Sequence, residues 1–548
     1  MIAESVHRIT VPRKGRMACI PPHRDVVRAE VAAREDYPLP GLWQQFNYDA
    51  KGDLLYGDKR VLDWVERYDA PLSVIDAAWV RRRVTELRAL LDTARRHTRY
   101  PAPTDIYYAA KARMHAGVVL PAYQAGALGE TSSAQDLMHL ELLFKAGLLP
   151  KAFTVISNGF KLPPERLDDR KPRKGVMIDD GAPPLDRYIE DYASAILRAH
   201  AVGLNVVPIL DSLDEVDWFS RRVAAPMQCG VRLAFGLTAD RLGLDSVNAG
   251  FGLTVAQARR ALKRLAGHPL LHPRMIHAMV GAAEASPSLP EIVDGVRLSA
   301  SLFFELKRDC PGLDTLNVGG GLPLLGDAYD HVGAFQAMMK AIQEEAERAG
   351  ATTLPRLAFE PGSLIAAEAN FNIMPVLAVK AQGLVGGAPI LFGIVDGSFI
   401  ESSIDGLLLG HDFPVIPANL ANRRAYPMWL RGVTCDSMDV WPPSTVNRDW
   451  LRLPVPRPNE KLYVVVAQIG AYQESLTGKG GVNHCAVKEP AEIVIDGDRH
   501  VLIPSPNTRD QSRLMGYTRK MLNLLAPQSK AAKPEPAVAF QAGSKDMW

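Results

Sequence analysis

Residues 105–112 read DIYYAAKA, an apolar run of strand-forming residues that carries a lysine, Lys111, near its end. Eight similar runs follow, each short and each ending in polar or glycine residues. Helical stretches separate them, and strands that alternate with helices indicate βα units around a parallel sheet. Eight such units close a (β/α)8 barrel, so one run is expected to be an excursion. The runs span residues 105–112, 127–133, 153–159, 175–181, 205–211, 230–236, 274–281, 315–321 and 356–362.

The sequence changes character on both sides of this α/β region. After about residue 365 the apolar runs lack intervening helices, which indicates an antiparallel β domain. We therefore expect an N-terminal extension over 1–70 that partly joins the β domain, a barrel over 71–365 and a β domain over 366–526. Residues 527–548 are rich in Pro, Ala and Lys and are expected to be a disordered tail.

The composition is that of a globular protein that can bury a large core. Of 548 residues, 47% are hydrophobic and 23% are charged, and 63 Lys and Arg balance 61 Asp and Glu. This balance gives no electrostatic reason to expect nucleic acid or a membrane surface as a partner. Five scattered cysteines with no CxxC argue against a disulfide framework or a zinc site. Without an apolar signal region or a spanning segment, we expect a cytoplasmic protein.

Polar residues at the ends of the predicted strands mark a candidate site, because the active site of such a barrel lies there. Lys111 inside an apolar run must be desolvated or paired. Desolvation would lower its pKa and suit it to Schiff-base formation; the alternative is a strand-end lysine whose amine reaches water. Residues 319–321 (GGG) either let backbone N–H groups approach an anion or form a tight turn. Glu360 is either a salt-bridged structural group or a partner for a cationic ring nitrogen.

Several motifs follow one another in an order similar to that of one known family. This family is the fold-type III decarboxylases, which use pyridoxal 5′-phosphate (PLP) to decarboxylate ornithine, lysine or diaminopimelate. The resemblance covers about residues 71–472, makes 175–181 the excursion, and implies a TIM-like barrel plus a C-terminal antiparallel β domain, as in alanine racemase and ornithine decarboxylase. The matching segments are residues 108–112, 129–136, 156–161, 211–215, 232, 319–321, 360–362, 396–397, 435–439 and 470–472.

The resemblance implies a role for each matched residue. Lys111 would hold PLP as a Schiff base, and Glu360 would pair with the protonated pyridine nitrogen and so favour the quinonoid intermediate of decarboxylation. Cys435 would help to protonate the substrate α-carbon. Asp436 would pair with the distal ammonium of an ornithine- or lysine-type substrate, and Asp396 is either a second acid for it or a turn residue. The residues expected to bind the cofactor are Lys111, Glu130, Ser133, Arg232, Met279, Gly319, Gly320, Gly321, Glu360, Gly362, Ser363 and Tyr472.

Four residues depart from the family pattern. Met279 stands where the family has the second histidine of His-x-His-x-Gly-Ser, and Ala282 stands where it has the phosphate-binding serine. Ser363 replaces the arginine after Glu-Pro-Gly, and Arg113 follows Ala112 where the family has asparagine. Arg113 either compensates for that lost charge or faces solvent. These changes predict weaker cofactor binding and an unusual subfamily that acts on a non-standard or carrier-linked amino acid.

The sequence thus predicts a PLP-dependent decarboxylase of a basic or diamino acid in polyamine or secondary metabolism. The resemblance further implies a homodimer with shared active sites, in which Cys435 and Asp436 come from the second subunit. A carrier protein is a further candidate partner. The alternatives are an amino-acid racemase or epimerase, which Glu360 opposes, and a non-catalytic homologue that acts as a regulator.

Overall fold

The structure is a computed structural model, and several internal segments and both ends of the chain lie outside the residues that it describes. The expected excursion at 175–181, Ala282, Cys19 and the expected tail at 527–548 fall outside the described residues. The described residues are 23–32, 41–162, 191–234, 250–281, 288–324, 329–385, 388–446, 451–477, 485, 487 and 489–503.

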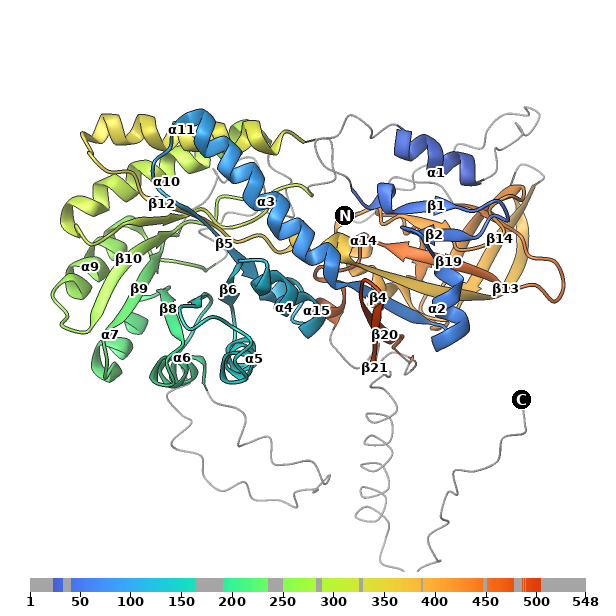
Figure 1. The fold of residues 1–548 in the computed structure, drawn as a ribbon, viewed down its shortest axis with the longest axis horizontal. Coiled ribbons are helices and arrows are strands. Elements are labelled where there is room, and N and C mark those ends of the chain that lie inside the picture. Colours follow the sequence, from blue (N-terminus) through green and yellow to red (C-terminus); the bar gives the residue numbers. More distant parts are fainter. Residues whose placement is uncertain are drawn as a thin grey trace, which may run out of the picture.

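Eight parallel strands form a closed barrel, which confirms the predicted (β/α)8 unit (Figure 1). Each strand falls on one of the predicted apolar runs. The ring closes where β12 pairs with β5, with Phe359 opposite Ile106. The barrel strands are β5 (Thr104–Ala109), β6 (Leu128–Thr131), β7 (Thr154–Ser157), β8 (Asn205–Leu210), β9 (Met227–Arg232), β10 (Leu271–His277), β11 (Thr315–Asn317) and β12 (Arg356–Phe359).

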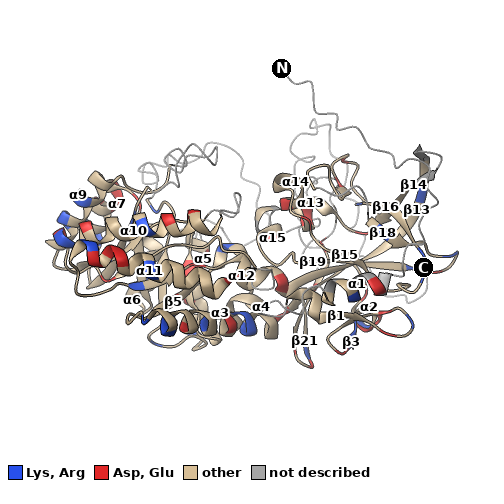
Figure 2. Ribbon diagram, turned by 90° about the horizontal axis from the view of Figure 1, so that it is seen from above, with Lys and Arg blue, Asp and Glu red and all other residues tan. Residues whose placement is uncertain are grey.

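Helices surround the barrel strands, and several begin at a residue that caps them. The side chains of Ser133, Ser212 and Thr254 each accept a hydrogen bond from a backbone N–H in the first turn of the following helix. Figure 2 shows acidic and basic residues mixed on outer helices such as α10 and α11. The helices are α3 (Ala77–Thr98), α4 (Ala116–Gln124), α5 (Ala134–Lys145), α6 (Tyr192–Ala201), α7 (Leu213–Arg222), α9 (Val255–Ala266), α10 (Leu289–Asp309) and α11 (His331–Ala349).

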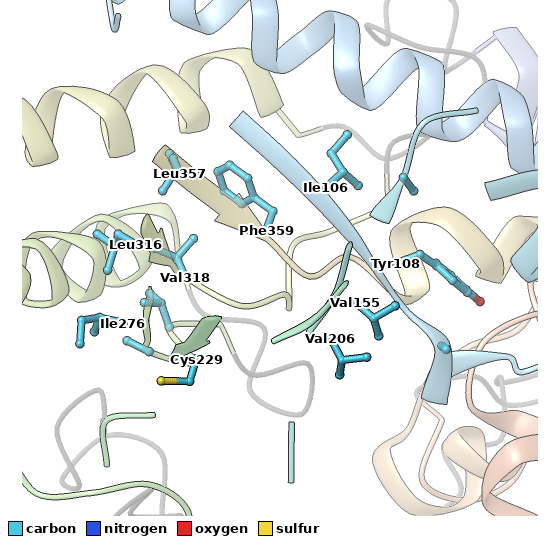
Figure 3. Packing of buried hydrophobic residues seen from close by; sticks show 14 of the residues in the cluster. Ile106, Tyr108, Val155, Val206, Cys229, Ile276, Leu316, Val318, Leu357 and Phe359 are labelled. Atoms are coloured by element: carbon cyan, nitrogen blue, oxygen red, sulfur yellow. The ribbon is translucent and has the colours of Figure 1, made fainter. Parts of the chain in front are cut away.

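Side chains on the barrel strands alternate between two hydrophobic clusters, as a strand's two-residue period requires. The larger cluster joins strand residues such as Ile106 and Tyr108 to the surrounding helices, and Figure 3 shows part of it. The smaller cluster contains only strand residues and fills the barrel interior. Its buried members are Tyr107, Ile156, Val207, Ile209, Met275 and Ala358.

A ten-stranded sheet forms the second domain. It is mostly antiparallel, as expected, but β14 pairs with β16 and β4 with β20 in parallel. β4 lies between β13 and β20, although its residues were expected to belong to the barrel segment. A strand followed by a helix resembles a barrel unit locally, and only the pairing of β4 reveals its place. The strands are β4 (Leu72–Asp76), β13 (Asn370–Val385), β14 (Ala388–Val395), β15 (Val415–Pro417), β16 (Ala425–Arg431), β17 (Val440–Trp441), β18 (Leu451–Pro454), β19 (Leu462–Ala467), β20 (Ala491–Asp496) and β21 (Arg499–Ile503).

The N-terminal segment packs its aromatic side chains on the second sheet. The rings of Phe46, Tyr56 and Trp64 surround Phe371 of β13, with centroids 5.6, 5.1 and 6.1 Å from it. These residues share one buried cluster with strands of the sheet, so the described part of the segment extends that domain. Its elements are α1 (His23–Ala32), η1 (Leu42–Gln45), β1 (Phe46–Tyr48), β2 (Leu54–Tyr56), β3 (Lys59–Arg60) and α2 (Val61–Tyr68).

Short helices lie between the longer elements, and those at 363–369 connect β12 of the barrel to β13 of the sheet. They begin at the ends of β5, β12 and β14, or follow residue 472. They are η2 (Ala110–Ala112), α12 (Ser363–Ala366), η4 (Ala367–Ala369), α13 (Phe399–Ser402), α14 (Ile404–Leu409) and α15 (Gln473–Thr477). Among the helices of the described ranges, none is both long enough and apolar enough to cross a membrane.

A buried ion pair joins three parts of the chain at the domain junction. Arg83 of α3 is fully buried, and its Nη2 donates to Oε2 of Glu368 at 2.6 Å. Oε1 of Glu368 accepts from the backbone N–H of Leu42 at 2.9 Å. The Arg83 guanidinium also lies 4.3 Å from the ring centroid of Trp79. Glu368 therefore ties the N-terminal segment to the helix that enters the barrel.

Replacing this carboxylate tests the junction. We expect Glu368→Ala to lower the free energy of unfolding by about 3 kcal/mol, because Arg83 stays buried and loses one of its charge partners. Urea unfolding of the full-length protein measures the change. The control is Glu344→Ala, which removes the partner of Arg297 on the exposed surface and is expected to change the midpoint little. Equal midpoints for the two variants would contradict the proposed role of Glu368.

Candidate active site

Every second residue of a barrel strand points into the barrel. Beyond the apolar cluster, the next inward-pointing residues are polar. Two residues after Ile156 comes Asn158, two after Met275 comes His277, and two after Ala358 comes Glu360. On β6, Glu130 follows the interior residue Leu128 in the same way. Because all eight strands are parallel, these side chains converge at the carboxyl end of the barrel. The two-residue period of the strands therefore brings polar side chains from distant parts of the sequence to one place.

Lys111 lies at this end of the barrel, directly after β5. Its Nζ is 3.9 Å from Oε1 of the fully buried Glu130, and 45% of its side chain is exposed. The carboxylate of Glu130 raises the pKa of Lys111, and Glu360 adds to this, although burial acts in the opposite direction. Burial thus lowers the pKa of Lys111 as expected, but pairing with the two carboxylates outweighs it, so the net shift is upward.

Glu130 and Glu360 are joined by a single amide. Nδ2 of Asn158 donates to Glu130 Oε1 at 2.9 Å and to Glu360 Oε2 at 3.0 Å. Asn317 Nδ2 donates to Glu360 Oε1 at 2.6 Å, and Ser132 Oγ donates to Glu130 Oε1 at 2.8 Å. Burial raises the pKa of Glu130, Lys111 lowers it, and the nearby Glu360 raises it further. The asparagines hold the two acids close together despite their repulsion.

Several buried polar atoms in this group have no hydrogen-bond partner among the described residues. They are Glu130 Oε2, Asn158 Oδ1 and both ring nitrogens of His277, whose Nε2 lies 3.4 Å from Glu360 Oε1. Burial, reinforced by Arg232 and Lys111, holds the pKa of His277 well below its usual value. His277 is therefore neutral at physiological pH. Unpaired buried polar groups are costly, so their clustering here fits a site built for a polar ligand.

The glycines after β11 form a close-packed loop over the same end. Gly319 and Gly321 have φ values of 75° and 86°, which side chains disfavour. A Cβ on Gly320 would lie 2.4 Å from the backbone oxygen of Glu360, and one on Gly319 would lie 2.4 Å from Sδ of Met279. Met279 is partly exposed beside this loop. Only glycine thus allows the three strand ends to approach each other so closely.

Gly362 and Tyr472 lie together next to the segment that carries Lys111. A Cβ on Gly362 would lie 2.9 Å from that of Ala112 and 3.4 Å from the hydroxyl of Tyr472. The backbone N–H of Tyr472 donates to the carbonyl of Ala112 at 2.8 Å. These contacts bring Gly362 and Tyr472 to the Lys111 segment. Elsewhere, Arg232 is the last residue of β9, and its guanidinium lies 4.6 Å from the ring centroid of Phe251.

Three predicted positions have a structural place that the sequence did not suggest. Ser133 Oγ accepts from the N–H of Asp136 at 3.1 Å, so it caps α5, and the adjacent Ser132 contacts Glu130 instead. Ser363 is the first residue of α12. Arg113 is buried and pairs with Glu492 at 2.9 Å and with Glu474. Both expectations for Arg113 are therefore wrong: it does not face solvent, and its charge is neutralised by the second domain.

Cys435, Asp436 and Asp396 lie in the second domain. The loop between β16 and β17 carries the first two and is fixed by the buried Asp439, which accepts from Phe399 N–H at 2.8 Å and Thr434 Oγ1 at 2.7 Å. The turn at Asp396 is adjacent to this loop, because the carbonyl of Gly397 accepts a hydrogen bond from the N–H of Val433 at 3.0 Å. These three residues thus form a second group, built on a different domain from Lys111.

Sequence reasoning missed Asn158, Asn317, Ser132 and the contact of His277 with Glu360. The two asparagines lie in strand runs that the sequence analysis recognised. They occupy inward-pointing positions just beyond the apolar core, and the alternation of side chains along the strand is the signal that identifies them. The contact between Ser132 and Glu130 has no comparable signal, because it depends on a side-chain rotamer after the strand has ended.

A small acidic cavity lies between Arg113 and the second domain. Its volume is about 30 Å³, and Glu401, Glu474, Glu489 and Glu492 are among its lining residues. Burial raises the pKa of Glu401 to about 8, and the charges of Glu489 and Glu474 add to the shift. Glu401 is therefore largely protonated in the folded protein at neutral pH.

Comparison with known proteins places decarboxylases among the relatives of this chain. No protein-family model matches it. It is 25% identical to diaminopimelate decarboxylase of Actinosynnema pretiosum over 86% of this chain and 95% of the relative. For the enzyme of that name from Mycobacterium tuberculosis the identity is 24% over 86% and 96%. Arginine decarboxylase 1B of Nicotiana tabacum is 30% identical over only 29% of this chain and 21% of the relative.

Solved structures share the fold. Biosynthetic arginine decarboxylase SpeA of Campylobacter jejuni has a TM-score of 0.67 at 17% identity, covering 89% of this chain and 92% of that one. Diaminopimelate decarboxylase of M. jannaschii with L-lysine has a TM-score of 0.66 at 15% identity, over 84% and 94%. Lysine/ornithine decarboxylase of Vibrio vulnificus with putrescine has 0.55 at 20%, over 80% and 97%. The expected resemblance to fold-type III decarboxylases is thus confirmed.

The raised pKa of Glu401 predicts a pH dependence of stability. The folded chain keeps this proton up to a pKa of about 8, whereas the ordinary value is 4.5. Its contribution to stability is therefore complete below pH 4.5 and is lost as the pH rises to about 8. We expect Glu401→Gln to flatten the decline of the urea midpoint over this range. The control is Glu305→Gln, which alters a partly exposed side chain of α10. A Glu401→Gln profile as steep as the parent's would contradict the argument.

Proposed function

We propose that this protein decarboxylates a basic amino acid with PLP as its cofactor. The observation that carries the proposal is the amine of Lys111 beside two buried carboxylates, Glu130 and Glu360, which one asparagine holds together at the open end of a (β/α)8 barrel. Relatives over most of the chain are diaminopimelate decarboxylases, which supports this reading.

The residues at the barrel end fit this cofactor. Lys111 offers an exposed amine, and Glu360 offers a carboxylate oriented by Asn158 and Asn317 for the ring nitrogen. The glycine loop at 319–321, with Gly362 and Tyr472, offers a surface without side chains for the phosphate. The unpartnered polar atoms of Glu130, Asn158 and His277 mark this space as one that a polar group would complete.

When bound, PLP supplies an electron sink for the electron pair that remains when CO2 leaves the substrate. Glu360 would keep a proton on the ring nitrogen and so strengthen that sink. Its two oxygens each accept a hydrogen bond from an asparagine amide, which holds the carboxylate in place. This is why we favour decarboxylation over racemisation.

Two side chains of the proposed site, Lys111 and Cys435, carry a proton that the reaction would use. Lys111 carries one at Nζ, since the neighbouring carboxylates raise its pKa. Attachment of the cofactor needs the neutral amine, so Glu130 is the base next to it that would receive this proton. Cys435 carries the other, because the adjacent Cys485 raises the pKa of its thiol. A protonated thiol suits a group that donates to the former α-carbon.

The two aspartates of the second domain would select the substrate. A basic amino acid carries a distal cation, and Asp436 and Asp396 lie on adjacent loops that can face it. Asp436 Oδ1 accepts from the N–H of Met438 at 2.8 Å, which fixes its orientation. One solved relative is in complex with L-lysine and another with putrescine. We therefore place ornithine, lysine and arginine ahead of acidic or neutral amino acids.

The group around Cys435 would act on a second copy of the chain. Val433 and Met438 flank Cys435 and Asp436, and their large apolar side chains are exposed. Exposed apolar residues beside a catalytic group are typical of an interface. We propose a homodimer in which this loop completes the Lys111 site of the partner.

The direct test follows the fate of the α-carbon. Purified protein with added PLP would be incubated in D2O with L- and D-forms of ornithine, lysine, arginine, diaminopimelate and glutamate, and the products analysed by mass spectrometry. We expect a basic amino acid to lose CO2 and to gain one deuterium at the former α-carbon, because a solvent-exchanged proton replaces the carboxylate.

Two variants control this experiment. Lys111→Ala should form no product, whereas Lys145→Ala, which alters an exposed lysine of α5, should match the parent. Deuterium gain without loss of CO2 would instead indicate a racemase. No change with any amino acid would contradict the assignment of a free basic amino acid as substrate.

A further inference from the structure

Cys435 has a second cysteine next to it. The Sγ atoms of Cys435 and Cys485 are 3.3 Å apart, and the backbone N–H of Cys435 donates to Cys485 Sγ at the same distance. The two residues are 50 positions apart in the sequence, so the fold brings them together. Both side chains are exposed.

This geometry is close to that of a disulfide. The bond length of a disulfide is about 2.05 Å, so the sulfur atoms need to approach by roughly 1.2 Å. Asp439 holds the loop of Cys435 in place through Phe399 N–H and Thr434 Oγ1. Rotation of a side chain supplies a movement of this size without a change in the loop.

The other described cysteines behave differently. Cys229 and Cys310 are buried, and burial raises the pKa of both thiols. An oxidant must reach the sulfur atom, so burial protects these two thiols. They serve as internal controls for any reagent that reaches Cys435 and Cys485.

We propose that Cys435 and Cys485 are a peroxide-oxidised site that forms a reversible disulfide. The thiolate of one cysteine attacks a peroxide oxygen, which breaks the O–O bond, leaves a sulfenic acid and, once protonated, releases one water or alcohol. The sulfur of the other cysteine then displaces the hydroxyl as water and forms the S–S bond. The two thiols lose two electrons and two protons, and the peroxide accepts them. A dithiol reductant reverses the bond by thiol–disulfide exchange.

The consequence for turnover rests on the function proposed above. A disulfide removes the proton from Cys435 and ties its sulfur to Cys485, so the thiol can no longer donate to the former α-carbon. A positioned proton donor contributes at least about 100-fold to a rate, and we expect a loss of that order in the oxidised protein. Reduction should restore the rate.

Peptide mass spectrometry tests the bond independently of activity. The full-length protein with added PLP would be treated with hydrogen peroxide, free thiols alkylated, and the chain digested with trypsin. Cleavage after Arg431, Arg448, Lys479 and Lys488 releases Cys435 in residues 432–448 and Cys485 in residues 480–488. We expect these two peptides to be joined, lighter than their sum by two hydrogens, and separated again by dithiothreitol.

Cys485→Ser is the matched variant. After the same peroxide treatment it should form no joined peptide, because Cys435 has lost the cysteine that it would bond to. Separate alkylation or separate overoxidation of the two cysteines in the parent, with Cys229 and Cys310 still alkylated, would overturn the proposal. A joined peptide in a protein without turnover would support the disulfide and contradict only the proposed function. Turnover without a joined peptide would do the reverse.

Discussion

Closure of the barrel is the constraint on which the rest of the structure depends. In a closed barrel of eight parallel strands, every second side chain points into one shared interior. The inward-pointing side chains at the carboxyl ends of the strands therefore lie close to one another. The apolar layer of Tyr107, Ile156 and Met275 fills the base of that interior. The polar layer above it has no space to spread apart, so Glu130 and Glu360 become neighbours.

The closeness of these carboxylates determines the chemistry of their surroundings. Two buried acids repel each other, and the asparagine amides and the Lys111 amine compensate for that repulsion. The same charges raise the pKa of Lys111, while Arg232 and burial keep His277 neutral. Cation, carboxylates and neutral imidazole therefore form one electrostatic group, and removing the charge of Glu130 would lower the pKa of Lys111.

The sequence predicted the barrel strands because strand period is a local property, and it singled out Lys111, Glu130 and Glu360, which the structure brings together. Its failures depend on contacts between distant segments. Arg113 pairs with Glu492 from 379 residues away, β4 joins a sheet formed by strands beyond residue 370, and Cys485 lies beside Cys435 from 50 residues away. The net rise in the pKa of Lys111 was not predicted for the same reason, because the strand itself predicts burial but not the two carboxylates. Asn158 stood in a recognised run, and the inward period would have identified it.

The central claim is that the amine of Lys111 holds the cofactor at the paired carboxylates. Borohydride reduction of the protein with PLP, followed by peptide mass spectrometry, tests it most directly, because reduction fixes the cofactor to the amine that holds it. The account predicts one cofactor mass per chain, on the peptide that contains Lys111. A label on another lysine, or no label while the protein remains folded, would contradict it.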